Sequence, residues 1–305
     1  MANKCSLQFA NTRNSRCKMD WSAVQKVVLI PIGARFTGLD PNSVVETFDA
    51  WIDRNIQLTD PMYRFYPLPI SSSLTDNSTE DTTWSDDAGN TYPMMDGKPA
   101  LQQAYQHDYC LSKRLSAFND NISRRALLID KSGFVWGARK TDGFTGFEVI
   151  VKTSNPGFDT FSERKQPTIS YMFQKVGEFN NEKDYETLEM NIEECEGLEN
   201  VYITIKKNGT TFYEVKIFAE CGNEDITANY STLLNVKKAW KTGADLSHLV
   251  EVASNPTYSS VTNTFSFTMA DLTTGQLFIM SDPAALAGLT NPVLGIECPE
   301  TVEVP

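Results

Sequence analysis

A mainly β fold is predicted for this chain of 305 residues. Between Arg124 and Phe147, two apolar runs are separated by Asp130–Gly133, and aspartate and glycine are residues that turns prefer. From Asn200 onward, apolar and polar residues alternate as far as Asn208-Gly209, which is the strongest short signal for a hairpin. Turn residues recur at intervals of about ten residues, a spacing that favours a β-sandwich.

The composition indicates a chain that builds its own core. Hydrophobic residues make up 41% of the sequence and aromatic residues 11%. The net charge of −12 disfavours binding to nucleic-acid phosphates, which needs clustered lysine and arginine, and it also disfavours anionic membranes. No run of about 18 apolar residues is present, so we expect no membrane-spanning helix and no membrane partner.

The first residues and the cysteine pattern favour synthesis in the cytoplasm. Residues 1–18 are polar and lack the apolar segment of a secretory signal. The cysteines form no CxxC pair, which argues against a zinc site, and we expect them to be reduced thiols. They are Cys5, Cys17, Cys110, Cys195, Cys221 and Cys298.

The elements before the central hairpin are expected in the order strand, helix, strand, loop, helix. The apolar run Gln25–Ile32 predicts a strand. In 40–56, an aspartate-proline pair is a favoured helix start and apolar residues follow at helical spacing, which predicts an amphipathic helix of roughly four turns. Two prolines place the extended segment Met62–Ile70 at a sheet edge. Ser71–Thr91 is expected to be a long polar loop, and Leu111–Phe118 a short helix.

After the central hairpin, the sequence predicts strands at Phe147–Lys152 and Thr168–Phe173. The polar, turn-rich segment Thr153–Gln166 joins them, and an acidic connector, Asn180–Asn200, follows. The hairpin at Asn208-Gly209 returns along Phe212–Ala219. Further strands are expected at Leu249–Ala253, Thr264–Met269, Gln276–Met280 and within Val293–Val304, with helices at Tyr230–Trp240 and, after an aspartate N-cap, at Pro283–Leu289.

These elements are expected to form three parts. Residues 1–22 are polar and are interpreted as an extended N-terminal arm. Residues 23–190 would form a β domain with long loops and a flanking helix. Residues 191–305 would form a C-terminal β-sandwich module of the immunoglobulin-like type.

Few residues in the chain are able to do chemistry. The two histidines, His107 and His248, accompany no nucleophile elbow, no phosphate-binding loop and no metalloprotease motif. Both are interpreted as surface or half-buried side chains. We therefore expect no enzyme activity, no catalytic or metal-binding residue and no cofactor, so that the function lies in the shape and the interfaces of the protein.

The segment 63–92 leaves two further interpretations open. Its carboxylates could ligate calcium, although their spacing does not match an EF-hand loop, or could hydrolyse glycosides as a pair. Its aromatic side chains could line a sugar groove, although core and interface packing is the more usual role. The acidic residues are Asp76, Glu80, Asp81, Asp86 and Asp87, and the aromatic residues are Tyr63, Phe65, Tyr66, Trp84 and Tyr92.

The central segment also carries a resemblance to a protein family. Leu127–Phe147 reads LLIDKSGFVWGARKTDGFTGF, and it resembles the tail-tube and related virion tail proteins of tailed bacteriophages, particularly those of Bacteroidota hosts, including crAss-like phages. There the segment looks like FLVDxxGxVWGTKTDGxxxGF. The order of strand, capped helix and acidic loop also matches, with further motifs at Asn77, Thr79, Glu80, Asp81, Asp96-Gly97-Lys98 and Ser116–Asn119.

The resemblance covers residues 24–175 and, more weakly, 200–300, where Glu220–Thr227 looks like a loop in the C-terminal β-module of the same proteins. The chain departs from the pattern at Ala138-Arg139 and in its glutamate-rich connector. These departures leave a tube, a ring and a tail-completion subunit as alternatives.

The resemblance implies a tail-tube-like β-sandwich that assembles with copies of itself into rings, hexameric ones in our expectation. Such rings would form a DNA conduit in the virion tail, made from subunits synthesised in the host cytoplasm. Neighbouring tail or neck proteins would be the other partners, and genomic DNA would pass the lumen without specific binding. A head decoration protein and a carbohydrate-binding β-sandwich are the alternatives, and a carboxylate glycosidase is a third.

Overall fold

The computed structural model describes residues 23–106, 109–154, 165–290, 293 and 295–305. The N-terminal arm expected at 1–22, His107 and most of the loop Thr153–Gln166 lie outside these residues. The protein is mainly β, as the sequence predicts. Among the described residues, the helices are too short or too polar to cross a bilayer.

The chain divides into two compact units. In the described part, unit 1 contains residues 23–53 and 65–196, and unit 2 contains residues 54–64 and 197–305. The division between Glu196 and Gly197 falls a few residues after the boundary expected at 190. No pattern in the sequence indicated that 54–64 belongs with the C-terminal unit.

Unit 1 is built on a ten-stranded sheet. Its strands are β1 (Val24–Ile30), β2 (Tyr66–Pro67), β3 (Ser73–Asp76), β6 (Ala100–Ala104), β7 (Ser123–Asp130), β8 (Phe134–Lys140), β9 (Gly143–Thr145), β10 (Phe147–Ser154), β11 (Thr168–Phe173) and β12 (Lys183–Thr187). The main path runs β12-β8-β7-β10-β11-β6-β3. In addition, β1 pairs with β2 and β7, and β9 pairs with β8.

The central hairpin of β7 and β8 forms as predicted. The Oδ1 atom of Asp130 accepts hydrogen bonds from the amides of Ser132 and Phe134, and its Oδ2 atom accepts one from the indole Nε1 of Trp136 at 2.9 Å. Gly133 has a φ of 81°, which glycine adopts without steric cost. Asp130 is fully buried, so these hydrogen bonds satisfy a carboxylate that water cannot reach.

Both faces of the middle strands of unit 1 are covered, which is why Val27–Ile30 of β1 and Ala126–Ile129 of β7 are unbroken apolar runs with every residue buried. On one face, helix α1 (Phe48–Ile56) contributes Trp51, whose ring lies edge-on to Phe65 at 4.7 Å between centroids. The other face belongs to a core cluster that includes Phe147 and Tyr171. Two more helices belong to this unit, α2 (Tyr109–Ser116) and α3 (Val176–Asn181).

The predicted helix at 40–56 is too long at its N-terminal end. Asp40 does not cap a helix: its Oδ1 atom accepts from the amides of Asn42 and Val44 and so closes a turn. Ser43 has a φ of 63°, which a helix cannot contain. The helix begins later, where the Thr47 hydroxyl accepts from the amide of Ala50. The prediction that Asp40 is a helix N-cap is therefore wrong: its side chain accepts local backbone hydrogen bonds, as an N-cap does, but in a turn that precedes the helix.

Three other predictions are corrected, two of them because a polar segment pairs as a strand. The polar loop expected at Ser71–Thr91 contains β3 and one strand of a separate hairpin. The acidic connector Asn180–Asn200 contains β12, which pairs with β8. The helix expected at Tyr230–Trp240 is replaced by two 3₁₀ turns, η1 (Thr227–Tyr230) and η2 (Lys237–Ala239).

Unit 2 consists of two sheets that share one core. One sheet has the order β17-β18-β14-β13-β20 and the other β16-β15-β19-β21. The strands are β13 (Glu199–Asn208), β14 (Phe212–Ala219), β15 (Trp240–Gly243), β16 (Val250–Glu251), β17 (Thr257–Ser259), β18 (Thr264–Thr268), β19 (Leu277–Met280), β20 (Ile296–Glu297) and β21 (Val302–Glu303). Trp240 of one sheet stacks on Phe278 and meets Phe267 of the other edge-on.

The predicted turn signals of unit 2 are confirmed. The hairpin of β13 and β14 turns at Gly209, which has a φ of 67°. Helix α4 (Pro283–Ala287) begins where the Asp282 side chain accepts from the amide of Ala285. A third 3₁₀ turn, η3 (Leu246–His248), begins at Asp245 in the same way.

The expectation that the cysteines are reduced is wrong for two of them. Cys110 and Cys221 each take part in a disulfide bond. Cys195 and Cys298 are free and buried, and burial raises the pKa of each thiol to about 11. Sequence spacing alone cannot reveal such pairs, because a disulfide depends on the distance between cysteines in the folded chain.

Candidate assembly surface

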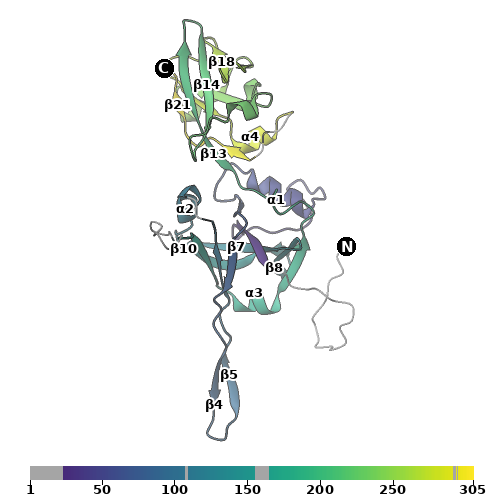
Figure 1. The fold of residues 1–305 in the computed structure, drawn as a ribbon. Coiled ribbons are helices and arrows are strands. Elements are labelled where there is room, and N and C mark those ends of the chain that lie inside the picture. Colours follow the sequence, from purple (N-terminus) through teal and green to yellow (C-terminus); the bar gives the residue numbers. More distant parts are fainter. Residues whose placement is uncertain (1–22, 107–108, 155–164, 291–292, 294) are drawn as a thin grey trace. The chain divides into compact units, whose positions relative to one another are not determined.

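The feature of unit 1 that the core does not explain is a projecting hairpin. Strands β4 (Thr82–Ser85) and β5 (Thr91–Met95) form a two-stranded sheet of their own. They continue the pair β3 and β6, and in Figure 1 they extend away from the strands β7, β8 and β10. We call residues 77–99 the hairpin arm.

The tip of the hairpin arm is ordered by one carboxylate. The Asp86 Oδ1 atom accepts from the amides of Ala88 and Asn90, and its Oδ2 atom accepts from the Asn90 side chain at 2.9 Å and the Tyr92 hydroxyl at 3.2 Å. The hydrogen bonds from Asn90, with smaller contributions from Tyr92 and Ala88, hold the pKa of Asp86 below its ordinary value. Gly89 completes the turn with a φ of 85°.

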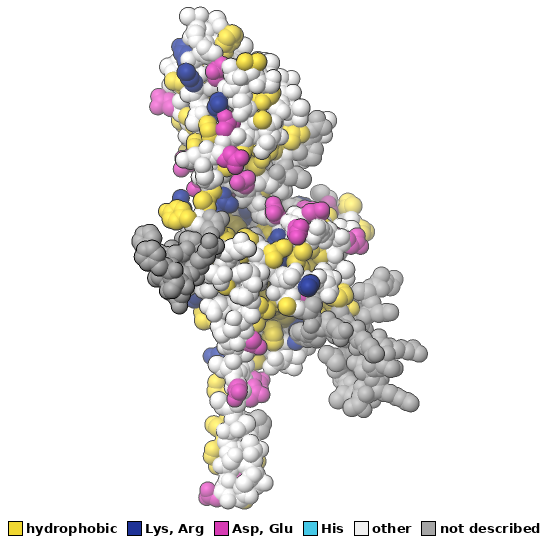
Figure 2. Space-filling view, in the orientation of Figure 1, with side chains coloured by type: hydrophobic (Ala, Val, Ile, Leu, Met, Phe, Trp, Pro, Cys, Tyr) yellow, Lys and Arg dark blue, Asp and Glu magenta, His cyan; other side chains and the backbone are white. Residues whose placement is uncertain are grey.

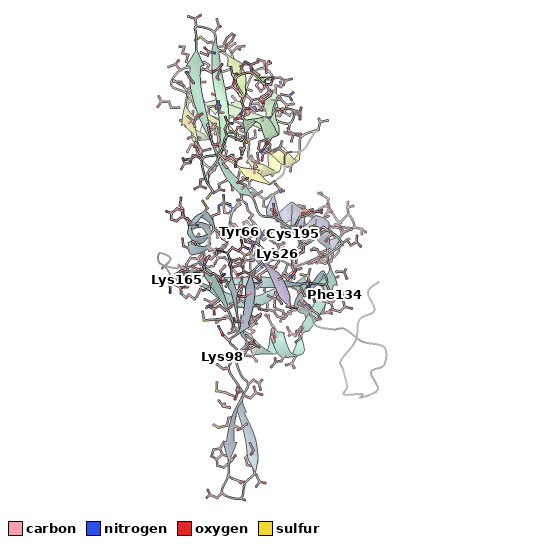
Figure 3. All side chains as sticks on the ribbon, viewed as in Figure 1. Lys26, Tyr66, Lys98, Phe134, Lys165 and Cys195 are labelled. Atoms are coloured by element: carbon pink, nitrogen blue, oxygen red, sulfur yellow. The ribbon has the colours of Figure 1, made fainter. Side chains whose placement is uncertain are left out.

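The base of the hairpin arm is fixed by bonds between its two sides. The Thr79 amide donates to the Lys98 carbonyl at 3.0 Å, and the Lys98 amide donates to the Thr79 hydroxyl at 2.7 Å. The Gly97 amide donates to Asp81 Oδ1 at 2.6 Å. A Cβ atom on Gly97 would lie 1.9 Å from the Thr79 carbonyl oxygen, so only glycine fits this crossing. Figure 3 labels Lys98 where the hairpin arm leaves the body of unit 1.

A buried polar cluster anchors the strand that leads out of the hairpin arm. Gln103 of β6 is fully buried, and its Oε1 atom accepts from the hydroxyls of Tyr105 at 3.0 Å and Tyr171 at 2.8 Å. Its amide nitrogen donates to the Ser71 hydroxyl at 3.2 Å. Burial raises the pKa of Tyr105 to about 12 and also raises the pKa of Tyr171 well above its ordinary value. Both hydroxyls therefore stay neutral hydrogen-bond donors at physiological pH. The hairpin arm therefore projects from a rigid root.

One part of the hairpin arm carries large apolar side chains in water. Trp84 and Tyr92 are directly opposite each other and their rings stack at 5.6 Å. Opposed residues of an antiparallel pair lie on the same face of it. Trp84 is 54% exposed, Tyr92 48%, Met94 67% and Met95 62%. Figure 2 shows hydrophobic side chains, in yellow, along one side of the projecting hairpin, with acidic side chains, in magenta, near its base and tip.

A projecting hairpin with exposed apolar side chains is unusual in a protein that stays monomeric. A two-stranded hairpin is marginally stable in water by itself, and no residue of β4 is buried. Tryptophan, tyrosine and methionine are the residue types enriched in protein interfaces. The combination fits a surface that is completed by another protein.

The main sheet of unit 1 offers a second kind of contact. Within the described residues, β12 and β3 end the main path, and each has one bonded neighbour, β8 and β6 respectively. The outer edge of β3 therefore presents backbone amides and carbonyls that can pair with another strand. β12 has the sequence KDYET, and Arg139 of β8 binds its Asp184 at 2.7 Å and also its Glu186.

The acidic residues of the segment 76–87 do not converge. Asp76 accepts a hydrogen bond from the Ser78 amide at 2.9 Å. Asp81 accepts one at the base of the hairpin arm, and Asp86 accepts several at its tip. The described part of the chain contains no group of three or more histidine, cysteine or carboxylate side chains placed to hold a metal ion. The carboxylates here act as turn acceptors, a role that the sequence pattern did not separate from ligation.

The aromatic residues proposed for a sugar groove have different surroundings. Phe65 is 1% exposed and packs on Trp51 in the core of unit 1. Tyr66 meets Phe118 edge-on at 5.6 Å. Tyr63 belongs to unit 2 and is exposed. Trp84 and Tyr92 are the pair that lies together in solvent, on the hairpin arm.

His248 lies beside a serine and an aspartate but does not form a triad with them. Its Nδ1 atom lies 2.7 Å from Asp245 Oδ1, and the Ser247 hydroxyl donates to the same carboxylate oxygen. In a catalytic triad the histidine joins the serine and the aspartate through different ring nitrogens. Here the aspartate caps η3, and the histidine side chain is 74% exposed.

No family model matches the chain, and no curated protein and no solved structure matches it.

Proposed function

We propose that this chain is a structural protein of a phage virion, a tail-tube or tail and neck ring subunit without enzyme activity. Copies assemble into rings, hexameric in the simplest form, and the rings form a conduit for DNA. The proposal combines the resemblance of 24–175 with one structural observation, the hairpin arm whose apolar side chains lie in solvent. In this proposal unit 1 is the tail-tube-like domain and unit 2 the immunoglobulin-like module.

The edge strand β3 of unit 1 supports ring formation. A contact between β3 of one copy and a different surface of the next copy repeats around a rotation axis until the ring closes. Such a contact also extends the sheet beyond β3, whose neighbour on the main path is β6.

The charge of the chain supports passage of DNA without retention. A net charge of −12 repels phosphates at the distances found inside a narrow channel. The hairpin arm and, by the same proposal, the segments 1–22 and Thr153–Gln166 are contacts between neighbouring rings. Neighbouring tail or neck proteins would occupy the same surfaces at the ends of the assembly.

Two alternative functions would also use the hairpin arm. A head decoration or neck protein would use the same hairpin arm for assembly without forming a tube. A carbohydrate-binding module would use the stacked and exposed pair Trp84 and Tyr92, because aromatic faces also pack on sugars. The decoration or neck protein differs from the conduit in the form of its particle. The carbohydrate-binding module differs from it in having a sugar ligand.

Imaging of the purified full-length chain separates these functions. Sedimentation velocity over a concentration series should show a discrete oligomer, and negative-stain microscopy should show annular particles with a central opening. A glycan array run on the same material should show no binding. A chain that stays monomeric at high concentration and binds a defined glycan would overturn the conduit in favour of the carbohydrate-binding module.

A further inference from the structure

We infer that the hairpin arm of one copy docks into a groove in unit 2 of another copy, with Trp84 as the side chain that enters it. This inference rests on the proposed function, because it names the partner surface of the hairpin arm. The groove has a volume of about 270 Å³, and Leu233, Val236, Lys237, Lys238, Asn255 and Leu289 are among its lining residues. We call it the lysine groove.

The lysine groove has an apolar floor and a basic rim. Leu233, Val236 and Leu289 are partly buried and pack against the core of unit 2. The consecutive lysines 237 and 238 lie in η2 and are both exposed. The groove thus offers one apolar surface and two positive charges in a chain whose net charge is strongly negative.

Its size fits a side chain better than a free ligand. Pockets for small molecules usually have volumes of roughly 300–1,000 Å³, and the lysine groove lies below that range. A single aromatic side chain is the kind of anchor that fills a small apolar pocket at the centre of a protein interface. Trp84 is the largest exposed side chain of the hairpin arm.

The charges of the two surfaces are opposite. Between Asp76 and Lys98 the chain has six carboxylates and a single lysine. Asp87, which is exposed, lies in the turn beyond Trp84 and Tyr92. With Trp84 in the groove, Asp87 comes within reach of the rim lysines, so apolar burial and ion pairing act at one contact. Opposite charges across an interface chiefly set its orientation and its rate of association.

Cross-linking between copies tests the contact directly. Equal amounts of ¹⁴N-labelled and ¹⁵N-labelled full-length protein are mixed, allowed to assemble and treated with a carbodiimide, which joins a carboxylate to an amine without a spacer. Mass spectrometry should find Asp87 joined to Lys237 or Lys238 in peptides of mixed isotope. Trp84→Ala should reduce these mixed products by about tenfold or more, because a central aromatic anchor contributes most of the energy of such a contact.

Two controls keep the result specific. Thr83→Ala changes an exposed side chain next to Trp84 and should leave the mixed products unchanged. Lys131→Glu makes the same charge change in unit 1 that Lys238→Glu makes in the groove, and only the latter should suppress cross-linking.

The outcomes distinguish this inference from the proposed function. If the chain assembles but Asp87 forms no product, or forms products of a single isotope only, the docking site is wrong and the ring subunit stands. If Lys237 and Lys238 are joined to acidic residues outside the hairpin arm, the groove has another occupant and the inference is overturned. If the wild-type chain does not assemble at all, the proposed function itself fails.

Discussion

At the scale of single residues, unit 1 depends on a buried ion pair whose contacts join five segments of the chain. Arg125 of β7 and Glu178 of α3 are each 3% exposed, with 3.3 Å between Nη2 and Oε1. Arg125 also donates to the carbonyls of Ile32 and Gly146. Glu178 accepts from Lys140 at 2.9 Å and from the Glu148 amide at 3.1 Å.

These contacts decide the charge of Glu178. Burial by itself raises the pKa of a carboxyl group, but the hydrogen bonds from Lys140 and the Glu148 amide and the charge of Arg125 outweigh it and hold the pKa below its ordinary value. The sequence could not have singled out this glutamate, which lies at the edge of a connector rich in glutamates. Only the packing of α3 against the sheet distinguishes it.

We predict that Glu178→Gln strongly destabilises unit 1. The substitution removes the negative charge and leaves the buried Arg125 with Glu148, at the longer distance of 3.9 Å, as its carboxylate, which should cost about 3–5 kcal/mol of the free energy of unfolding. Urea denaturation followed by circular dichroism measures this loss. Glu182→Gln is the matched control, since Glu182 binds the same Lys140 but is 42% exposed, and it should cost less than about 1 kcal/mol. Equal effects of the two variants would contradict the assignment.

At the scale of elements, the hairpin arm is the clearest case of a structure hidden from sequence patterns. Its strands have four and five residues, a proline interrupts β5, and a bulge lies between Thr82 and Thr83. The turn Asp86–Asn90 was visible as a group of polar residues but was assigned to a loop. The longer hairpins were predicted correctly because their apolar residues form an unbroken run, as in Ala126–Ile129, or alternate with polar ones, as in β14.

Gly97→Ala should loosen the hairpin arm without unfolding the sheet. The new methyl group would overlap the Thr79 carbonyl, so the base of the hairpin arm must shift, at a cost of about 1–3 kcal/mol that is local to it. Hydrogen exchange read by mass spectrometry should show faster exchange at the Thr79 and Lys98 amides and unchanged protection in β7.

Gly177→Ala is the control for this substitution, because the nearest atom to an added Cβ there is 4.0 Å away. It should leave the exchange of the hairpin arm unchanged. Unaltered protection at Thr79 in Gly97→Ala would mean that the crossing of the two sides is looser than the structure indicates.

At the scale of the whole molecule, both units depend on carboxylates whose pKa is lowered by folding. In unit 2, burial raises the pKa of Asp271, but hydrogen bonds from the side chains and amides of Ser254 and Thr268 prevail and lower it. In unit 1, Glu178 is held in the ionised form as described above. Each unit thus has a buried carboxylate that must stay charged.

The stability of the protein should therefore fall in acid. A carboxylate whose pKa is lower in the folded state than in the unfolded state stabilises the fold above its unfolded pKa, and this stabilisation is lost as the pH falls through its folded pKa. The free energy of unfolding should be near its maximum around neutral pH and should decrease below about pH 4.5 for Glu178 and pH 3.8 for Asp271. Urea titrations at pH 7, 5, 4 and 3 measure it, and Asp271→Asn should flatten the acid limb of unit 2. A stability that rises on acidification would contradict this account.

The sequence by itself determined the class of the fold and most of its long strands. Apolar periodicity and turn residues such as Asp130, Gly133 and Gly209 act locally, so they can be read from neighbouring positions. The N-cap at Asp282 belongs to the same kind of signal.

The tertiary structure decided what the local pattern left open. The edge strand β12 and the buried Arg125–Glu178 pair depend on segments far apart in the chain. Whether a polar stretch becomes a strand or a loop depends on a partner strand, and whether a carboxylate caps, pairs or ligates depends on what the fold brings next to it. These outcomes depend on contacts between distant residues, so local sequence patterns do not predict them.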